Sequence, residues 1–242
     1  MTHKTALAIF LAGLTTLAAT SAASAQTRES KIFVDVNVGA QTEARTLSTS
    51  TSFPLYGETA IVNAATAVDG GGLFDISGRY RIMPKVSAGV GFSIFSKKGD
   101  GTLIASIPNP NFLNRSATST TDATDLKHRE QAVHLMAAYT IPITMVDNLD
   151  ATVFAGPSFF SLKQDILSAT VTPNTQTAVV ATTSESASKA GANVGVNINY
   201  MATPNYGAGV FLRYAGATIE LPSAGDVKVG GFQLGIGARL RF

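Results

Sequence analysis

Apolar and polar residues alternate along most of the chain with a period of two. In residues 230–242, apolar side chains fill every even position from Phe232 to Phe242, while glycine, glutamine and arginine fill the odd positions. A period of two places the apolar set on one face of a β-strand. Seven earlier segments repeat the pattern, so we predict eight strands in all; the earlier seven are 31–41, 72–82, 86–95, 130–141, 149–160, 190–200 and 206–214.

The connections between these strands alternate between short and long. The short ones carry Pro, Asn or Asp, as tight turns do, and occupy 83–85, 142–148 and 201–205. The long ones are rich in Ser, Thr and Asn and are predicted as loops near 42–70, 97–128, 161–188 and 216–226. Loops of this length are uncommon in compact soluble domains, whereas short turns at one end and long loops at the other are typical of membrane barrels. The segments 102–106 and 177–183 alternate as well and could extend the strands.

The alternation alone does not say which way the apolar face points. A lipocalin-like barrel turns it inward, and a membrane barrel turns it to lipid. Three features favour lipid: the polar face is rich in Gly, Ser and Asn, the last strand spans about 25 Å when tilted, and aromatics mark both ends of the apolar face. The aromatics are Tyr80, Tyr139, Tyr200, Tyr206 and Phe242 at the short-turn end, and Phe74, Phe159, Tyr214 and Phe232 towards the loops. We therefore predict an all-β fold, a transmembrane eight-stranded antiparallel up-and-down β-barrel.

The first segment has the features of a secretory signal peptide. Lys4 precedes an apolar stretch at 6–18, and the small residues 23–25 come before Gln26. An N-terminal membrane anchor is the alternative, but the apolar run is short and interrupted by threonines. We predict a signal peptide over 1–25 that is removed, and a barrel domain over 26–242.

Composition narrows the possible functions. Cysteine is absent, which excludes disulfides, thiolate metal sites and a lipid-modified cysteine. The formal net charge of +2 does not suggest a nucleic-acid partner. Three histidines give no metal cluster, and the glycine-rich stretches lie in predicted strands rather than before a helix, so neither a metal nor a nucleotide cofactor is expected.

The last strand resembles the C-terminal strand of bacterial outer-membrane proteins, in which a terminal Phe forms part of the signal read by the barrel-assembly machinery; Phe242 occupies that position. The architecture resembles the small eight-stranded proteins of the OmpA-barrel, OmpX and OmpW kind. "GGLFDISGRYRI", "REQAVHLMAAYTIPI" and "VFAGPSFFSLKQDI" are similar to outer membrane β-barrel domain proteins. The resemblance implies a monomer in the outer membrane of a Gram-negative bacterium, in contact with membrane lipid and lipopolysaccharide, and it brings no assigned chemistry.

Charged side chains on the polar face predict a network inside the barrel. Its expected members are Asp35, Arg79, Arg81, Glu130, His134, Asp150, Arg213, Arg239 and Arg241. Because the first strand should pair with the second and the eighth, we expect Asp35 to lie between Arg79 and Arg239. Buried charges require partners, so a structural network is favoured over a gated ion path.

Glu130 and His134 share the inner face of one strand, and Ser158 on the next strand could lie near them. Outer-membrane lipid A deacylases use a Ser/His/Glu set, and Glu130 would have to orient the histidine. A hydrogen-bonded lumen histidine is the favoured interpretation.

One predicted loop is rich in cations: Lys97, Lys98, Arg115, Lys127 and Arg129. These cations could meet lipopolysaccharide phosphates, although nearby carboxylates also fit an ordinary solvated loop. The sequence therefore favours a non-enzymatic protein with a structural or surface-interaction role. A narrow channel for small or hydrophobic molecules is the alternative, and a lipid A-modifying enzyme is less favoured.

Overall fold

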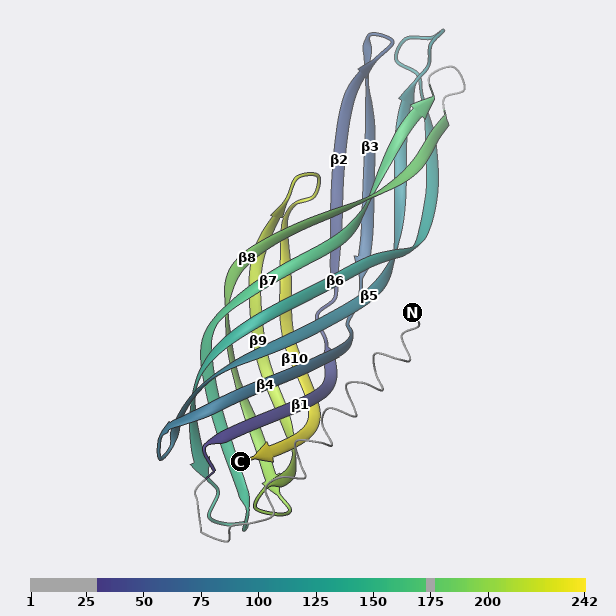
Figure 1. The fold of residues 1–242 in the computed structure, drawn as a ribbon. Coiled ribbons are helices and arrows are strands. Elements are labelled where there is room, and N and C mark those ends of the chain that lie inside the picture. The colour runs from purple at the N-terminus through teal and green to yellow at the C-terminus, as the bar shows by residue number, and fades with distance from the viewer. Residues whose placement is uncertain (1–29, 173–176) are drawn as a thin grey trace, which may run out of the picture. The chain divides into compact units, whose positions relative to one another are not determined.

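The computed structural model describes residues 30–172 and 177–242, and the predicted signal peptide lies outside them. The described residues form ten antiparallel strands, β1 to β10 (Figure 1). Their bounds are Ile32–Gln41, Arg45–Leu55, Glu58–Val68, Gly71–Met83, Val86–Pro108, Ser116–Pro142, Leu149–Thr172, Thr177–Met201, Tyr206–Leu221 and Gly225–Arg241. No helix in this part of the chain is long and apolar enough to cross a membrane.

Eight of the strands close into a ring. The hydrogen-bonded order runs β5-β4-β1-β10-β9-β8-β7-β6, and β6 pairs again with β5. The closing pair of first and last strands includes Asp35 opposite Arg239 and Val38 opposite Ile236. These eight strands contain the eight segments predicted from the alternation, so the barrel fold is confirmed.

β2 and β3 are additional strands that lie in the segment 42–70, for which a loop is predicted. They form a hairpin that pairs with the far half of β5, outside the ring. The hairpin turns at Tyr56 and Gly57, both with positive φ, as a two-residue hairpin turn requires. Prediction missed the hairpin because small residues, Ser, Thr and Ala, dominate its polar–apolar pattern.

The other predicted long loops are also mostly strand. β5 and β6 continue to a tip at 109–115, and β7 and β8 extend to 172 and from 177. We call the set formed by β2, β3 and the segments 101–108, 116–123, 167–172 and 178–182 the tower. Figure 1 shows β2–β3 and the far ends of β5–β8 rising together beyond the β9–β10 hairpin, at the end of the barrel opposite the short turns.

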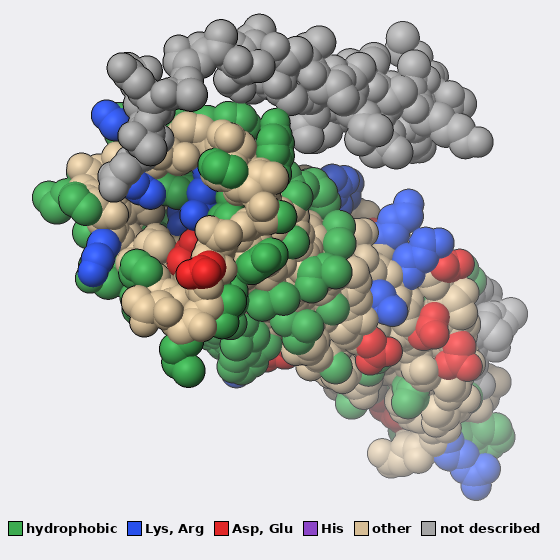
Figure 2. Space-filling model, turned by 90° about the horizontal axis from the view of Figure 1, so that it is seen from below, with side chains coloured by type: hydrophobic (Ala, Val, Ile, Leu, Met, Phe, Trp, Pro, Cys, Tyr) green, Lys and Arg blue, Asp and Glu red, His purple; other side chains and the backbone are tan. Residues whose placement is uncertain are grey.

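Apolar side chains form a band on the outside of the barrel. They are largely exposed, and they appear as green side chains covering the barrel wall in Figure 2. The band includes Tyr80, Val90, Val133, Leu135, Phe159, Val194, Ile198, Leu212, Tyr214, Phe232 and Ile236. Water would solvate such a surface poorly, whereas acyl chains match it.

The tower has the opposite polarity. Its inner side is a buried apolar cluster that includes Val62, Leu103 and Leu167. Leu103 is 0% exposed, while the next residue, Ile104, is 45% exposed on the outer side. On β6 the change of face coincides with an extra residue: Gly99 pairs with Leu126 but Gly101 pairs with Ala123, and Asp125 has φ 63°. A bulge of this kind shifts the side-chain alternation by one position.

Candidate functional site

Polar side chains from the ring strands other than β5 point into the barrel and bond to one another along its length. We call this connected set the polar column. Most of its members are buried with exposures of a few per cent: Asp35, Asn37, Gln41, Asp75, Arg79, Glu130, Asp150, Asn199, Arg213, Gln233 and Arg239. The two-residue period that turns Val and Ile to the outside turns these groups inward.

Asp35 on β1 organises the turn-end half of the column. Its carboxylate oxygens lie 2.9 Å from Arg79 Nη2 and 3.6 Å from Arg239 Nε. Ser77 and Asn197 also donate hydrogen bonds to it. The predicted placement of Asp35 between two arginines is therefore present. A carboxylate shared by two guanidinium groups offsets much of their desolvation.

Arg239 extends these contacts towards the turn end. Its Nε donates to Asn199 Oδ1 at 2.6 Å, and its Nη1 donates to Asn37 Oδ1 at 2.6 Å. Asn199 in turn donates to Asp150, which forms an ion pair with Arg241. The column thus reaches the rim of the barrel at the turn end.

Three arginines surround one aromatic ring at the same rim. The guanidinium carbons of Arg79, Arg81 and Arg241 lie 5.1–5.7 Å from the ring centroid of Phe33. Phe33 lies on the inner face of β1 and is buried. Arg81, predicted as part of the network, therefore packs over this ring, a cation–π arrangement.

Arg213 continues the column through the middle of the barrel. Its Nη1 lies 2.8 Å from Asp75 Oδ2, and its Nε donates to Gln233 at 2.7 Å. Gln233 donates to Gln41, which donates to Glu130. Because each link joins different strands, the column ties the ring together across its interior.

Glu130 ends the column at the loop end, just beyond the apolar band that begins at Val133. Its carboxylate lies 2.5 Å from Arg45 Nη1 and 2.7 Å from His128 Nε2, and it accepts the Gly230 N–H at 2.8 Å. Burial alone would raise the pKa of Glu130. The hydrogen bond with His128 and the positive charge of Arg45 outweigh burial, so this pKa lies below its ordinary value.

Arg45 connects the tower to the barrel. It stands at the start of β2, and besides Glu130 it donates to the backbone carbonyls of Lys228 and Gly230 on β10. One side chain therefore fixes the base of the β2–β3 hairpin against two strands of the ring. Charge-assisted bonds of this kind are stronger than neutral ones.

His134 lies in a separate buried cluster. Its Nδ1 is 2.7 Å from Ser158 Oγ and its Nε2 is 2.9 Å from Ser93 Oγ. Asn193 donates to Ser158 at 2.8 Å. The predicted proximity of His134 and Ser158 is present, but Glu130 bonds to His128 instead, so the hypothesis that Glu130 orients His134 is wrong. The four-residue separation along β6 places the two side chains at different heights in the lumen.

An apolar cluster fills the loop end of the barrel, from the height of Ala132 and Phe160 outward. It joins Leu47 and Val68 at the base of the tower hairpin to inward residues of four ring strands, β6, β7, β9 and β10. Phe160, Leu162, Ile219 and Val229 are 0–3% exposed. The interior that the structure describes is therefore filled by side chains: two small apolar clusters lie beside the polar column, and the larger apolar cluster lies at the loop end.

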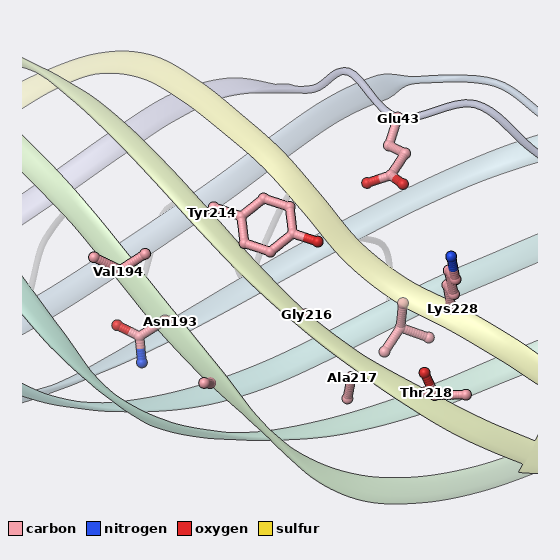
Figure 3. Close-up of a pocket in the computed structure, with 10 residues that line it drawn as sticks. Glu43, Asn193, Val194, Tyr214, Gly216, Ala217, Thr218 and Lys228 are labelled. Atoms are coloured by element: carbon pink, nitrogen blue, oxygen red, sulfur yellow. The ribbon is translucent and has the colours of Figure 1, made fainter.

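A notch interrupts the barrel wall at the loop end of the apolar band. β8 and β9 pair only as far as Ala192 opposite Gly216, and beyond that point β8 follows β7 while β9 follows β10. The diverging strands leave a cavity of about 400 Å³. Figure 3 shows it lined by Val194 and Tyr214 on one side and by Glu43 and Lys228 on the other. Such a lining suits a molecule with an apolar part and a polar part.

Sequence reasoning missed several members of these clusters. Arg45 and His128 fell in segments assigned to loops, although His128 continues the inward alternation of Glu130 and His134. Asp75, Asn37 and Gln41 lie on the polar face of the alternation, but their partners depend on strand register, which the sequence does not fix. Among the described residues, no group of three or more His, Asp or Glu side chains could hold a metal ion.

The model of the protein family described as "Outer membrane protein beta-barrel domain" matches residues 10–239. The comparison with curated proteins found no match.

Solved structures with a similar fold include three outer-membrane proteins. OprG from Pseudomonas aeruginosa is 9% identical, with 89% of this chain and 97% of that chain covered and a TM-score of 0.47. Neisserial surface protein A is 15% identical, with coverages of 87% and 97% and a TM-score of 0.45. The outer membrane protease OmpT from Escherichia coli is 9% identical, with coverages of 92% and 100% and a TM-score of 0.48. At these identities and scores, nothing about activity follows.

Proposed function

Because the chain belongs to the outer membrane protein β-barrel domain family, we propose that it is a non-enzymatic integral barrel of a Gram-negative outer membrane with a structural or surface-interaction role. Its signal peptide directs it out of the cytoplasm, and the tower projects from the cell. The apolar band faces acyl chains, and the short turns face the periplasm.

The tower is the observation that carries this proposal. Its apolar core, with Leu103, Ala105 and Ile107 all 0% exposed, holds three hairpins together outside the lipid-facing band. A hydrophobic core orders a projecting segment that would otherwise be a mobile loop. A rigid projection with a Ser- and Thr-rich exterior supports a role in presenting a fixed surface to the surroundings.

The packed interior supports a role other than transport. The polar column and the apolar cluster beyond it occupy the lumen, and an eight-stranded barrel is barely wide enough for its own side chains. We expect the processed protein to show no sustained current in planar lipid bilayers. A stable ohmic current that changes when Arg239 or Glu130 is replaced would reject this view.

The isolated His134 cluster supports the absence of lipid A chemistry. Ser158 and His134 are both 0% exposed, and among the described residues no carboxylate hydrogen-bonds to His134. A serine nucleophile requires substrate access and an oriented base. We expect lipid A of identical mass from cells with and without the protein. A mass difference that disappears with Ser158→Ala would establish the enzymatic alternative.

A positive test of the surface role compares cells that display the wild-type protein with cells that display a shortened one. The variant replaces 45–68 by a short turn and leaves the eight ring strands intact. We expect altered autoaggregation or adhesion to surfaces, with equal amounts of folded barrel in the outer membrane. Unchanged adhesion and autoaggregation at equal display would contradict a tower-based interaction.

The notch favours a second candidate, a narrow passage for small or hydrophobic molecules. A side chain at Gly216 would project into the notch, since a Cβ there meets its nearest neighbour, the Val229 carbonyl oxygen, at 3.4 Å. If the notch admits such molecules, Gly216→Leu should slow uptake of a hydrophobic dye into proteoliposomes. Equal uptake by wild type, Gly216→Leu and protein-free vesicles would exclude this candidate.

A further inference from the structure

Four cations lie together on the outer surface where the apolar band ends. Lys98 on β5, Lys127 and Arg129 on β6, and Lys163 on β7 are all exposed. Lys127 is directly opposite Lys98, and Arg129 is directly opposite Lys163. Directly opposed residues in an antiparallel sheet have Cβ atoms about 5 Å apart, so the charges are neighbours. Figure 2 shows Lys and Arg side chains gathered beyond one end of the green band.

Such an arrangement of like charges is unfavourable unless an anion compensates it. The surroundings supply two carboxylates: Asp125 pairs with Lys98 at 2.9 Å, and Asp165 accepts the backbone N–H of Lys127 at 3.0 Å. In the described residues, no carboxylate lies within ion-pair distance of the Arg129 or Lys163 side chain. Four cations and two carboxylates leave an excess of positive charge centred on Arg129 and Lys163.

The height of the cluster identifies its surroundings. Arg129 lies four residues beyond the exposed Val133, and Lys163 lies four residues beyond the exposed Phe159; Val133 and Phe159 are themselves opposite each other. Four residues of a tilted strand rise about 10 Å along the membrane normal. Side chains at this height meet lipid head groups, while the apolar residues below them meet acyl chains.

We propose that Arg129 and Lys163, with Lys127, form a binding site for the phosphate groups of a phosphorylated glycolipid of the outer leaflet. Arg129 offers a fork of N–H donors that matches a phosphate, and the two lysines add point charges around it. The acyl chains of the same molecule lie over the band at Val133 and Phe159. This continuity between cations and apolar band favours a lipid over a free phosphate ion.

The test measures binding of diphosphorylated lipid A to the processed protein in detergent micelles by native mass spectrometry. The variant is Arg129→Gln/Lys163→Gln, and the matched control is Lys85→Gln/Arg115→Gln, which removes two exposed cations far from the cluster. We expect the cluster variant to lose at least about tenfold in affinity, and the control to stay within a factor of two. An equal loss in both would show a general charge effect and overturn the proposal.

Three further measurements separate the alternatives. Dephosphorylated lipid A with the same acyl chains should bind wild type as weakly as the diphosphorylated form binds the cluster variant. Inorganic pyrophosphate should not displace lipid A at comparable concentration; if it does, the site belongs to soluble anions and the glycolipid assignment is wrong. In lipid-free detergent, Arg129→Gln should leave the unfolding temperature equal or higher, because it relieves repulsion. A lower unfolding temperature would mean a structural ion pair instead.

Discussion

The charged side chains inside the barrel are shielded from bulk water. Water therefore does not replace a partner that a substitution removes. Asp35, Arg79 and Arg239 are each 2–5% exposed, and they form one connected group. Removing one member of a buried group is far more costly than the net gain from forming it. The lumen is therefore sensitive to substitutions that conserve size but remove charge.

Asp35→Ala should destabilise the barrel, because it leaves two guanidinium groups buried without their shared carboxylate. The expected loss is about 3–5 kcal/mol, measured as thermal unfolding in detergent micelles followed by the change in gel mobility. Asp226→Ala, at an exposed position on β10, is the control and should have little effect. An unchanged unfolding temperature for Asp35→Ala would disprove the structural role of the column.

Residue positions also show what sequence can and cannot predict here. The neighbours of Asp35 followed from the closure of a barrel, because the first strand must pair with the second and the last. The partners of Glu130 did not follow, because Arg45 comes from a hairpin outside the ring and His128 from a segment taken as loop. His134 and Ser158 were correctly suspected of proximity, since β6 and β7 are joined by a short turn.

At the level of elements, the tower and the barrel share β5 to β8, and each has an apolar cluster; the barrel cluster also includes Leu47 and Val68 at the base of the tower hairpin. Barrel strands were predictable because large apolar residues alternate with Gly, Asn and charges. Tower strands were less predictable because Ser, Thr and Ala give weak contrast between the faces, and because the bulge at Asp125 shifts the alternation within β6. The long segments between the predicted strands are expected to be loops, whereas the chain forms strands of up to 27 residues there.

Arg45→Ala should loosen the β2–β3 hairpin from the barrel without unfolding the ring. Hydrogen–deuterium exchange followed by mass spectrometry should show faster exchange in 45–68. The peptides of β9 and β10 between the Arg213–Gln233 pair and the short-turn end should stay protected. Uniformly faster exchange in all strands would show that Arg45 supports the whole fold.

Acidification should have the same local effect. The pKa of Glu130 is lowered in the folded protein. The ion pair of Glu130 therefore stabilises the fold fully when the pH is above the pKa of a glutamate in the unfolded chain, and this stabilisation is lost as the pH falls through the lowered pKa. Exchange in 45–68 should therefore rise only below about pH 4.5. A rise already at pH 6 would assign the effect to another group.

Leu103→Ala should destabilise the tower core, because Leu103 is fully buried there, with an expected cost of about 2–5 kcal/mol. Ile104→Ala removes a similar side chain from the outer surface and is the matched control. Limited proteolysis of the folded protein should cut Leu103→Ala within the tower and leave Ile104→Ala uncut. The barrel of each variant should stay intact. Equal resistance of the two variants would mean that the tower lacks a cooperative core.

For the whole molecule, the decisive feature is closure of the ring by the last strand. The Phe242 backbone donates to the Ile32 carbonyl at 2.9 Å and accepts from the Lys31 and Ile32 N–H groups. Phe242→Ala keeps these bonds and removes only the ring that the assembly machinery is expected to read. We expect less folded barrel in the outer membrane, measured by gel mobility of membrane fractions, with normal refolding in detergent.

Phe112→Ala, at the tip between β5 and β6, removes an aromatic side chain that is more exposed than Phe242, 59% against 38%, and should assemble normally. If Phe242→Ala accumulates to the wild-type level, the last side chain is no assembly signal in this protein.

The reversal of polarity along β5 and β6 restricts the order in which the protein can form. The tower's apolar core draws on three hairpins, and its exterior is rich in Ser and Thr, so the assembled tower matches hydrocarbon poorly. The assembled tower therefore cannot cross a bilayer. Each hairpin must therefore pass through as an open chain segment, and the three hairpins can dock only after reaching the far side. With the tower on the outer side of the membrane, as we propose, docking of its hairpins is the last step of folding.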